Sequence, residues 1–156
     1  MNPKVYIDTS VIGGYLDEEF RIHSGRLFAD FQADRLKAVV SDVTLAELRV
    51  APATVLGLLK HPALQSAERV FLDEEAVLLS DAYIDNTVVG PSQRVDAQHI
   101  AIATVQRVDI LVSWNFAHIV KWSRIRGFNS VNLERGYPPL EIRSPREVYY
   151  EDETET

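Results

Sequence analysis

The sequence predicts an α/β protein, a three-layer α/β/α sandwich around a central, mainly parallel sheet of five strands. Short apolar runs that favour strands alternate with longer helical segments along the whole chain, and strands separated by helices pair in parallel. The run within residues 109–113 is continuously apolar, which is typical of a strand covered on both faces. With 156 residues, 46% of them hydrophobic, the chain is long enough for one full core. We expect a single domain over residues 1–148 and an acidic, frayed tail over residues 149–156.

Each strand is expected where β-branched, leucine or aromatic residues cluster between polar or turn-forming residues. The expected strands are residues 5–7, 36–40, 69–72, 109–113 and 130–133. The expected helices are residues 11–16, 18–34, 43–49, 52–60, 73–86, 94–107 and 118–126, with irregular segments at 137–140 and 144–145. Asp42 is the expected N-cap of the helix 43–49. Gly13 and Gly14 either allow a close backbone approach or mark a break.

Composition limits the classes of function. A net charge of −7 argues against a protein that simply coats nucleic acid, since such proteins bind phosphates mainly through Lys and Arg. No apolar run approaches the ~20 residues that span a bilayer, and the first residues lack the layout of a signal peptide. We therefore expect a cytoplasmic protein with no membrane partner. The absence of cysteine excludes disulfides and a cysteine nucleophile and fits a reducing compartment.

Charge is unevenly distributed near the C-terminus. Residues 147–156 hold five acids and no base, a local charge of −5. Residues 119–146 hold two acids and six bases, which are Lys121, Arg124, Arg126, Arg135, Arg143 and Arg146. This local charge of +4 predicts a basic lip beside an acidic centre, although an ordinary charged surface is an equal alternative for any one of the arginines.

Three acids occupy positions that solvation alone explains poorly. Asp8 directly follows the first strand, Glu47 lies in an apolar-leaning helix after the second strand, and Asp96 begins the most apolar helix. Ligands of open α/β sheets bind at the carboxyl ends of the strands. Carboxylates are rarely buried without a compensating cation, and hard cations such as Mg²⁺ take oxygen ligands. Together the three acids predict a metal site.

Each acid has an alternative explanation when it is taken by itself. Asp8 would be a helix N-cap, Glu47 an exposed helix residue, and Asp96 a partner of the positive end of its helix dipole. Only the joint placement of the three acids favours a common site.

Several neutral or basic residues are candidates to support such a site. Thr9 and Ser10 would hold a metal-bound water or cap the following helix. His99, His118 and Lys121 are candidates for contact with substrate. For the two histidines the alternative is a side chain satisfied within the core.

Four motifs occur in a fixed order: Val5-Tyr6-Ile7-Asp8-Thr9-Ser10, Ser41-Asp42-Val43-Thr44-Leu45-Ala46-Glu47, Val95-Asp96-Ala97-Gln98-His99-Ile100-Ala101 and Leu111-Val112-Ser113-Trp114-Asn115-Phe116. With these motifs the chain resembles PIN-domain proteins, and in particular VapC-type ribonuclease toxins, over nearly its whole length except the acidic tail. The resemblance implies neighbouring first and fourth strands, an active site at their carboxyl ends, and Mg²⁺- or Mn²⁺-dependent cleavage of RNA. It also implies a homodimer and a cognate antitoxin that blocks the site.

The resemblance makes Asp8, Glu47 and Asp96 the metal ligands, and these three with Asn115 the catalytic residues. PIN domains commonly supply a further acid where this chain has Asn115. The amide oxygen of Asn115 would bind a cation without adding charge, so a second metal should bind more weakly. Asp109 does not substitute for this acid, because four strand residues place it on the order of 13 Å away.

Other classes of protein match the sequence less well. A haloacid-dehalogenase-like phosphatase needs a second aspartate where this chain has Ser10. A receiver domain needs a paired acid near its start, and a nucleotide-binding flavodoxin-like fold needs a glycine-rich phosphate loop; the chain has neither. The main rival hypothesis is a PIN-like module that binds a protein partner or RNA without cutting it, which the amide at position 115 favours.

Overall fold

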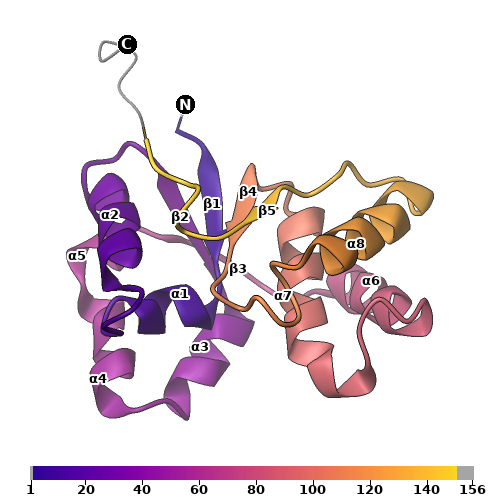
Figure 1. Cartoon of the computed structure of the whole chain (residues 1–156), viewed down its shortest axis with the longest axis horizontal. Coiled ribbons are helices and arrows are strands. Elements are labelled where there is room, and N and C mark those ends of the chain that lie inside the picture. Colours follow the sequence, from indigo (N-terminus) through magenta and orange to yellow (C-terminus); the bar gives the residue numbers. More distant parts are fainter. Residues whose placement is uncertain (1, 151–156) are drawn as a thin grey trace.

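The computed structural model describes residues 2–150, and these form a five-stranded sheet with the order β3-β2-β1-β4-β5 (Figure 1). The strands are β1 (Lys4–Ile7), β2 (Lys37–Ser41), β3 (Glu68–Val70), β4 (Ile110–Val112) and β5 (Ile142–Arg143). Each strand runs parallel to the strands it pairs with. The predicted fold class is confirmed, with a sheet that is parallel throughout.

The helices cover both faces of this sheet. They are α1 (Thr9–Gly14), α2 (Arg21–Gln32), α3 (Asp42–Arg49), α4 (Ala53–Leu56), α5 (Pro62–Gln65), α6 (Glu74–Asp85), α7 (Arg94–Val105) and α8 (Trp122–Glu134), with short 3-10 helices at Gly57–Lys60 and Pro91–Gln93. In Figure 1, α1 to α5 lie on one side of the sheet and α6 to α8 on the other. Within residues 2–150, no helix has both the length and the apolar character needed to cross a membrane.

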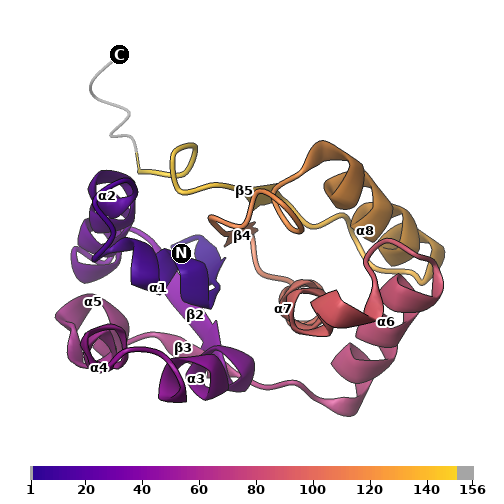
Figure 2. The same cartoon turned by 60° about the horizontal axis from the view of Figure 1, so that its bottom comes forward.

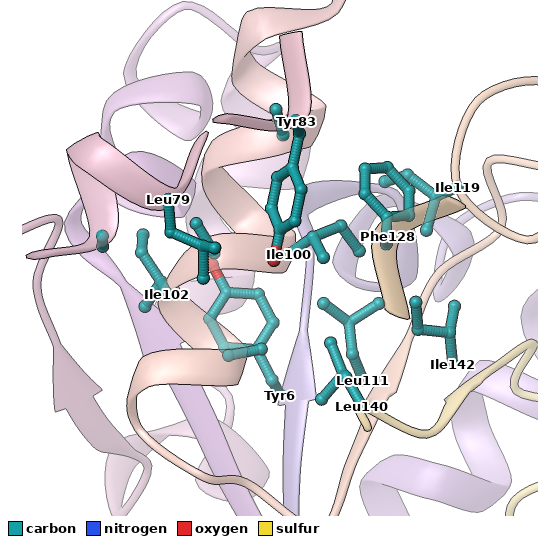
Figure 3. Close-up of a cluster of buried hydrophobic side chains, with 14 of the residues drawn as sticks. Tyr6, Leu79, Tyr83, Ile100, Ile102, Leu111, Ile119, Phe128, Leu140 and Ile142 are labelled. Atoms are coloured by element: carbon teal, nitrogen blue, oxygen red, sulfur yellow. The ribbon is translucent and has the colours of Figure 1, made fainter. Parts of the chain in front are cut away.

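The alternation of side chains along the strands divides the core into two clusters. Val5 and Ile7 of β1 pack in the cluster under α1 to α5, and Tyr6 points into the other. Figure 3 shows Tyr6 and Leu111 from the sheet meeting Ile100 of α7 in this second cluster. All of these side chains are fully buried. The period-two alternation of buried side chains therefore explains why the structure needs a helical layer on each face.

The strand order reverses between β1 and β4. The chain builds β2 and β3 on one side of β1 and then crosses over to add β4 and β5 on the other side. Such a reversal leaves a crevice at the carboxyl ends of the two strands, where ligands bind in open α/β sheets. Because Ile7 pairs with Val112, the next residues, Asp8 and Ser113, leave the sheet side by side. In Figure 2 this edge comes forward, with α1, α3 and the start of α7 near it.

The predicted fifth strand, residues 130–133, is wrong. These residues form the last turns of α8, in which Phe128, Val131 and Asn132 are buried at helical spacing. A stretch of only four residues that alternates polar and apolar side chains fits both the strand period of about 2 and the helix period of about 3.6 residues. Here the stretch continues the long helix α8, and this decides in favour of a helix. The fifth strand is instead Ile142–Arg143, paired with β4 between segments expected to be irregular. Its two residues are too few to give a periodic signal.

Two other expectations differ from the structure in detail. Ser41, not Asp42, is the N-cap of α3, because its hydroxyl accepts a hydrogen bond from the Thr44 backbone N–H. The carboxylate of Asp42 instead accepts from the Leu72 backbone N–H at 2.9 Å. The helix expected at 118–126 begins only at Trp122, because the backbone after β4 first makes a series of turns.

Tyr149 and Tyr150, where the predicted tail begins, lie against α2. The Tyr150 backbone N–H donates to Asp30 at 3.0 Å, and the Arg26 guanidinium lies 4.7 Å from the centre of the Tyr149 ring. The acidic residues predicted to be frayed, 151–156, lie outside the described residues.

The two glycines of α1 should respond oppositely to alanine. A Cβ at Gly14 would lie 2.6 Å from Trp114 Nε1 and 2.7 Å from Ser24 Oγ, whereas a Cβ at Gly13 meets nothing within 4 Å. We expect Gly14→Ala to lower the free energy of unfolding by about 1–3 kcal/mol through overpacking, and Gly13→Ala to leave it unchanged or raise it by up to about 1 kcal/mol. Urea unfolding measures both, and equal stability of the two variants would contradict the close approach at Gly14.

Candidate active site

The structure brings the three predicted acids to the carboxyl edge of the sheet. Asp8 follows β1, Glu47 lies on α3, and Asp96 lies in the first turn of α7. Thr9, the neighbour of Asp8, donates a hydrogen bond to Glu47 Oε1 at 2.7 Å. Burial raises the pKa of Asp96, and the charges of Asp8 and Glu47 raise it further. The acids are therefore close enough to repel one another.

Asp8 is buried, with 5% of its surface exposed. Its Oδ1 accepts from the Ser10 hydroxyl at 2.6 Å and from the Val11 backbone N–H at 3.2 Å. Its Oδ2 accepts from the Ser113 hydroxyl at 2.6 Å. The bond to Val11 makes Asp8 the N-cap of α1, so the alternative explanation for this residue holds alongside its place in the site.

Burial is also the main influence on the charge of Asp8, and it raises the pKa of the carboxyl group. The attraction of His99 and the hydrogen bonds described above oppose this rise and do not cancel it. The charged form of Asp8 is therefore less favourable here than in water, and such shifted pKa values are common at functional sites.

Glu47 is half-buried and held through one oxygen. Its Oε1 accepts from Thr9 and also from His99 Nε2 at 2.6 Å. Burial alone would raise the pKa of Glu47, but the hydrogen bond and charge of His99, with the hydrogen bond from Thr9, lower it. Within residues 2–150 no hydrogen bond reaches Oε2, so this oxygen is available to a ligand.

His99 connects Glu47 to the interior of the sheet. Its ring is 2% exposed, and its Nδ1 lies 2.6 Å from the Tyr6 hydroxyl, which lies 2.7 Å from Ser41 Oγ. Because a carboxylate only accepts, Nε2 carries the proton, and in the neutral ring Nδ1 accepts from Tyr6. His99, a candidate for substrate contact, therefore lies in the interior with both nitrogens bonded to protein groups.

Asn115 directs its amide NH₂, and not its amide oxygen, at Asp96. Its amide oxygen accepts from the His118 backbone N–H at 2.9 Å, which leaves the amide NH₂ directed at Asp96 Oδ1, 3.4 Å away. A backbone N–H requires an acceptor, so this contact decides the orientation. The amide oxygen keeps a second lone pair, so binding of a cation by Asn115 stays a prediction.

The remaining candidates differ in how closely they are tied to the three acids. Thr9 and Ser10 both donate to carboxylates of the site, Glu47 and Asp8 respectively. His118 is half-buried, and its charge opposes the rise in the Asp96 pKa, which places the two residues near each other. Lys121 is exposed at the start of α8.

The chemistry of the donor set fits a hard divalent cation, because Asp8, Glu47 and Asp96 supply carboxylate oxygens at one edge. As the side chains stand, no group of three or more His, Asp or Glu residues within residues 2–150 converges into a ready-made cage. The Asp8 oxygens accept from hydroxyls and a backbone N–H, and Glu47 Oε1 accepts from His99. A cation would therefore use Glu47 Oε2 and further lone pairs of the two aspartates.

Sequence reasoning missed Ser113, Tyr6 and Ser41. Ser113 had a usable signal, because it directly follows β4 as Asp8 follows β1, and the ends of neighbouring parallel strands lie together. Tyr6 had none, since an aromatic residue in a strand is ordinarily part of the core.

Comparison with known proteins supports the fold. No protein-family model matches the chain, and no curated protein matches its sequence. FitAcB from Neisseria gonorrhoeae is similar over 92% of this chain and 99% of its own, with a TM-score of 0.59 and 14% identity. VapBC2 from Rickettsia felis, bound to a DNA fragment from its promoter, is similar over 90% and 98%, with a TM-score of 0.56 and 12% identity.

A third similar structure, FitAB bound to an IR36 DNA fragment, covers 95% of this chain and 99% of its own, with a TM-score of 0.57 and 13% identity. At such identities the likeness concerns the fold alone. It confirms the predicted PIN-like α/β architecture along almost the whole chain.

Replacing Asp8 with Asn should not destabilise the protein at neutral pH. Because burial raises the Asp8 pKa, the folded protein binds more protons than the unfolded chain between the two pKa values, and stability falls as pH rises through that window. Asn removes the charge and keeps an acceptor for Ser10. We expect the stability of Asp8→Asn relative to wild type to increase from about pH 4 upward and level off above the folded-state pKa. Urea unfolding across this range measures it, and a relative stability that decreases with pH would contradict the sign.

Removing the Tyr6 hydroxyl should weaken the fold. Tyr6→Phe leaves His99 Nδ1 and the Ser41 hydroxyl without their buried partner. The expected loss is about 1–3 kcal/mol of unfolding free energy. Tyr15→Phe is the matched control, since the Tyr15 ring stacks on Phe28 and its hydroxyl bonds to nothing within the described part of the chain. Similar losses in both variants would mean that the hydrogen bonds contribute nothing.

Proposed function

We propose that this chain is a divalent-metal-dependent endoribonuclease that hydrolyses RNA phosphodiester bonds as the toxin of a type II toxin–antitoxin pair. One observation carries the proposal: Asp8, Glu47 and Asp96, remote in sequence, lie together where the strand order reverses. The ordered motifs that contain these acids resemble those of VapC-type toxins, and the fold agrees with that resemblance.

Asp8, Asp96 and Glu47 would hold Mg²⁺ or Mn²⁺. When bound, such an ion lowers the pKa of a water molecule and neutralises charge on the scissile phosphate. Ser10 and Ser113 orient the Asp8 carboxylate through its two oxygens, and His99 holds Oε1 of Glu47, which leaves Oε2 to bind the ion. The Asn115 amide offers an N–H to Asp96, and the same group would donate to a phosphate oxygen.

The proposed partners are an antitoxin and a second copy of the chain. The similar structures are two-component complexes by their names, and two of them hold DNA. By analogy, an antitoxin would cover the acidic edge and restrain cleavage. We expect the protein to act in the cytoplasm, where its RNA substrate is found.

A second candidate function is a PIN-like module that binds a protein or RNA without cutting it. The amide at position 115 favours it, because Asn115 adds no negative charge to the site and one lone pair of its oxygen already accepts from the His118 N–H. Calorimetric titration with Mn²⁺ separates the two candidates. The nuclease should bind the ion and lose that binding in Asp8→Asn, whereas a purely binding module has no need of the ion.

Cleavage of RNA should depend on Asp8 and on a divalent ion. We expect wild type to cleave single-stranded RNA with Mg²⁺ or Mn²⁺ and not with EDTA, and Asp8→Asn to be at least about 100-fold slower, more than the loss of an outer-shell partner of a metal ligand typically causes. Asp109→Asn is the matched control, since Asp109 lies at the other end of β4 and, among residues 2–150, its side chain accepts only from the Lys4 backbone N–H. Equal rates for wild type and Asp8→Asn would refute the nuclease proposal.

A further inference from the structure

An exposed tryptophan begins α8. Trp122 is 73% exposed, whereas the other tryptophan of the chain, Trp114, is 5% exposed. The Arg126 guanidinium lies 4.8 Å from the centre of the Trp122 ring, and the two residues share a helix face because they are four positions apart. An aromatic ring with this exposure offers a flat apolar face, and the guanidinium beside it adds a positive charge.

Trp122 lies near the candidate active site. The backbone N–H groups of Ile119 and Val120 both donate to the Asn115 carbonyl oxygen, at 3.1 and 2.8 Å, so the chain turns tightly after β4. At about 3.8 Å per residue, the Trp122 Cα lies within about 12 Å of that oxygen. The helix also starts at the correct edge, since α8 connects the parallel strands β4 and β5 and must begin at the carboxyl end of β4.

The surroundings of Trp122 are basic although the chain as a whole is acidic. Residues 113–133 contain no Asp or Glu, in a chain with 23 acids and a net charge of −7. Lys121 and Arg126 are exposed, and within residues 2–150 neither takes part in an ion pair. We call Lys121, Trp122 and Arg126 the Trp122 patch. It combines an aromatic face with unpaired positive charge.

We propose that the Trp122 patch is a stacking platform for single-stranded RNA that leads into the active site. The inference rests on the proposed nuclease function for the identity of the polymer. A base would stack on the exposed face of the indole, with Arg126 on the ring, while Lys121 contacts a phosphate. Three stacked nucleotides at about 3.4 Å each would span most of the distance to Asn115. Single strands are favoured because their bases are free to stack on a protein ring.

The charges favour RNA over a protein as the occupant. Two copies of this patch would repel each other across a two-fold interface, where the same surface of each copy meets. The cores of protein interfaces are enriched in Trp and Arg but depleted of lysine, so Lys121 is the residue of the patch that favours a polyanion over a protein. RNA offers both a base to stack on the indole of Trp122 and a phosphate for Lys121, so RNA is the occupant that we propose.

The test measures RNA binding without cleavage. End-labelled single-stranded RNA of mixed sequence is titrated with the full chain in EDTA, and its fluorescence anisotropy is followed. We expect Trp122→Ala to weaken binding about tenfold, Trp122→Phe to weaken it less, and stacking to quench the tryptophan emission of wild type. Lys121→Ala, which removes the proposed phosphate contact, should weaken binding and reduce its salt dependence. Duplex RNA of the same sequence should bind more weakly than the single strand.

Leu133→Ala is the matched control, because Leu133 is an exposed apolar residue, at 59%, near the far end of the same helix. It should bind RNA as wild type does. Circular dichroism checks that each variant is folded, and Trp122→Phe remains informative if Trp122→Ala is not. Unchanged RNA affinity in a folded Trp122 variant, or an equal loss in Leu133→Ala, would overturn the proposal. So would unchanged affinity together with a shift in oligomeric state in sedimentation, since the patch would then be a protein interface.

The outcome is separable from that of the nuclease proposal. If the protein cleaves RNA in Mg²⁺ but Trp122→Ala binds RNA as wild type does, the nuclease proposal holds and the stacking role of the Trp122 patch is refuted. Binding that depends on Trp122 without any metal-dependent cleavage would support the platform, and the chain would then be the RNA-binding module of the second candidate function.

Discussion

The burial of the Asp8 carboxylate between β1 and β4 is the constraint on which the candidate site depends. A carboxylate there has lost its water, and the Ser10 hydroxyl, the Ser113 hydroxyl and the Val11 N–H take its place. Two of these donors belong to the start of α1 and the third follows β4, so satisfying the carboxylate also fixes these elements against each other. The pKa of Asp8 stays raised because these donors do not fully replace the lost water, and shifts of this kind are common at functional sites.

The pKa of Glu47 is shifted in the opposite direction from that of Asp8, because its hydrogen-bond partners lower it. Glu47 lies on a helix surface, but His99 reaches it from the interior and is itself held by the Tyr6 hydroxyl. Strand β1 thus contributes to both acids. Asp8 follows its last residue, and Tyr6, two residues before Asp8, holds the histidine that binds Glu47. Hydrogen-bonded supports of this kind orient ligands in metal sites.

Most of the fold was predictable because its strongest signals are local. The apolar run at 109–113 requires a strand buried on both faces, and the alternation of strands with helices requires a parallel sheet. The predictions failed where the local signal was short. Residues 130–133 alternate like a strand but continue a helix, and the two residues of β5 are defined only by their pairing with β4. The joint position of the three acids was predictable for the same reason as the sheet, since Asp8 follows β1, Asp96 lies in the first turn of α7, and Glu47 lies on the short helix that follows β2.

The sequence by itself determined the fold class, the positions of the three acids along the chain and the edge at which they meet, because hydrophobic periodicity and the parallel connection of strands follow from local residue types. Only the tertiary structure decided which atoms face the site. Asn115 turns its amide oxygen towards the His118 N–H, His99 is drawn inward by Tyr6, and Ser113 completes the shell of Asp8. The orientation of a side chain depends on donors and acceptors from distant segments, and these become neighbours only when the chain has folded.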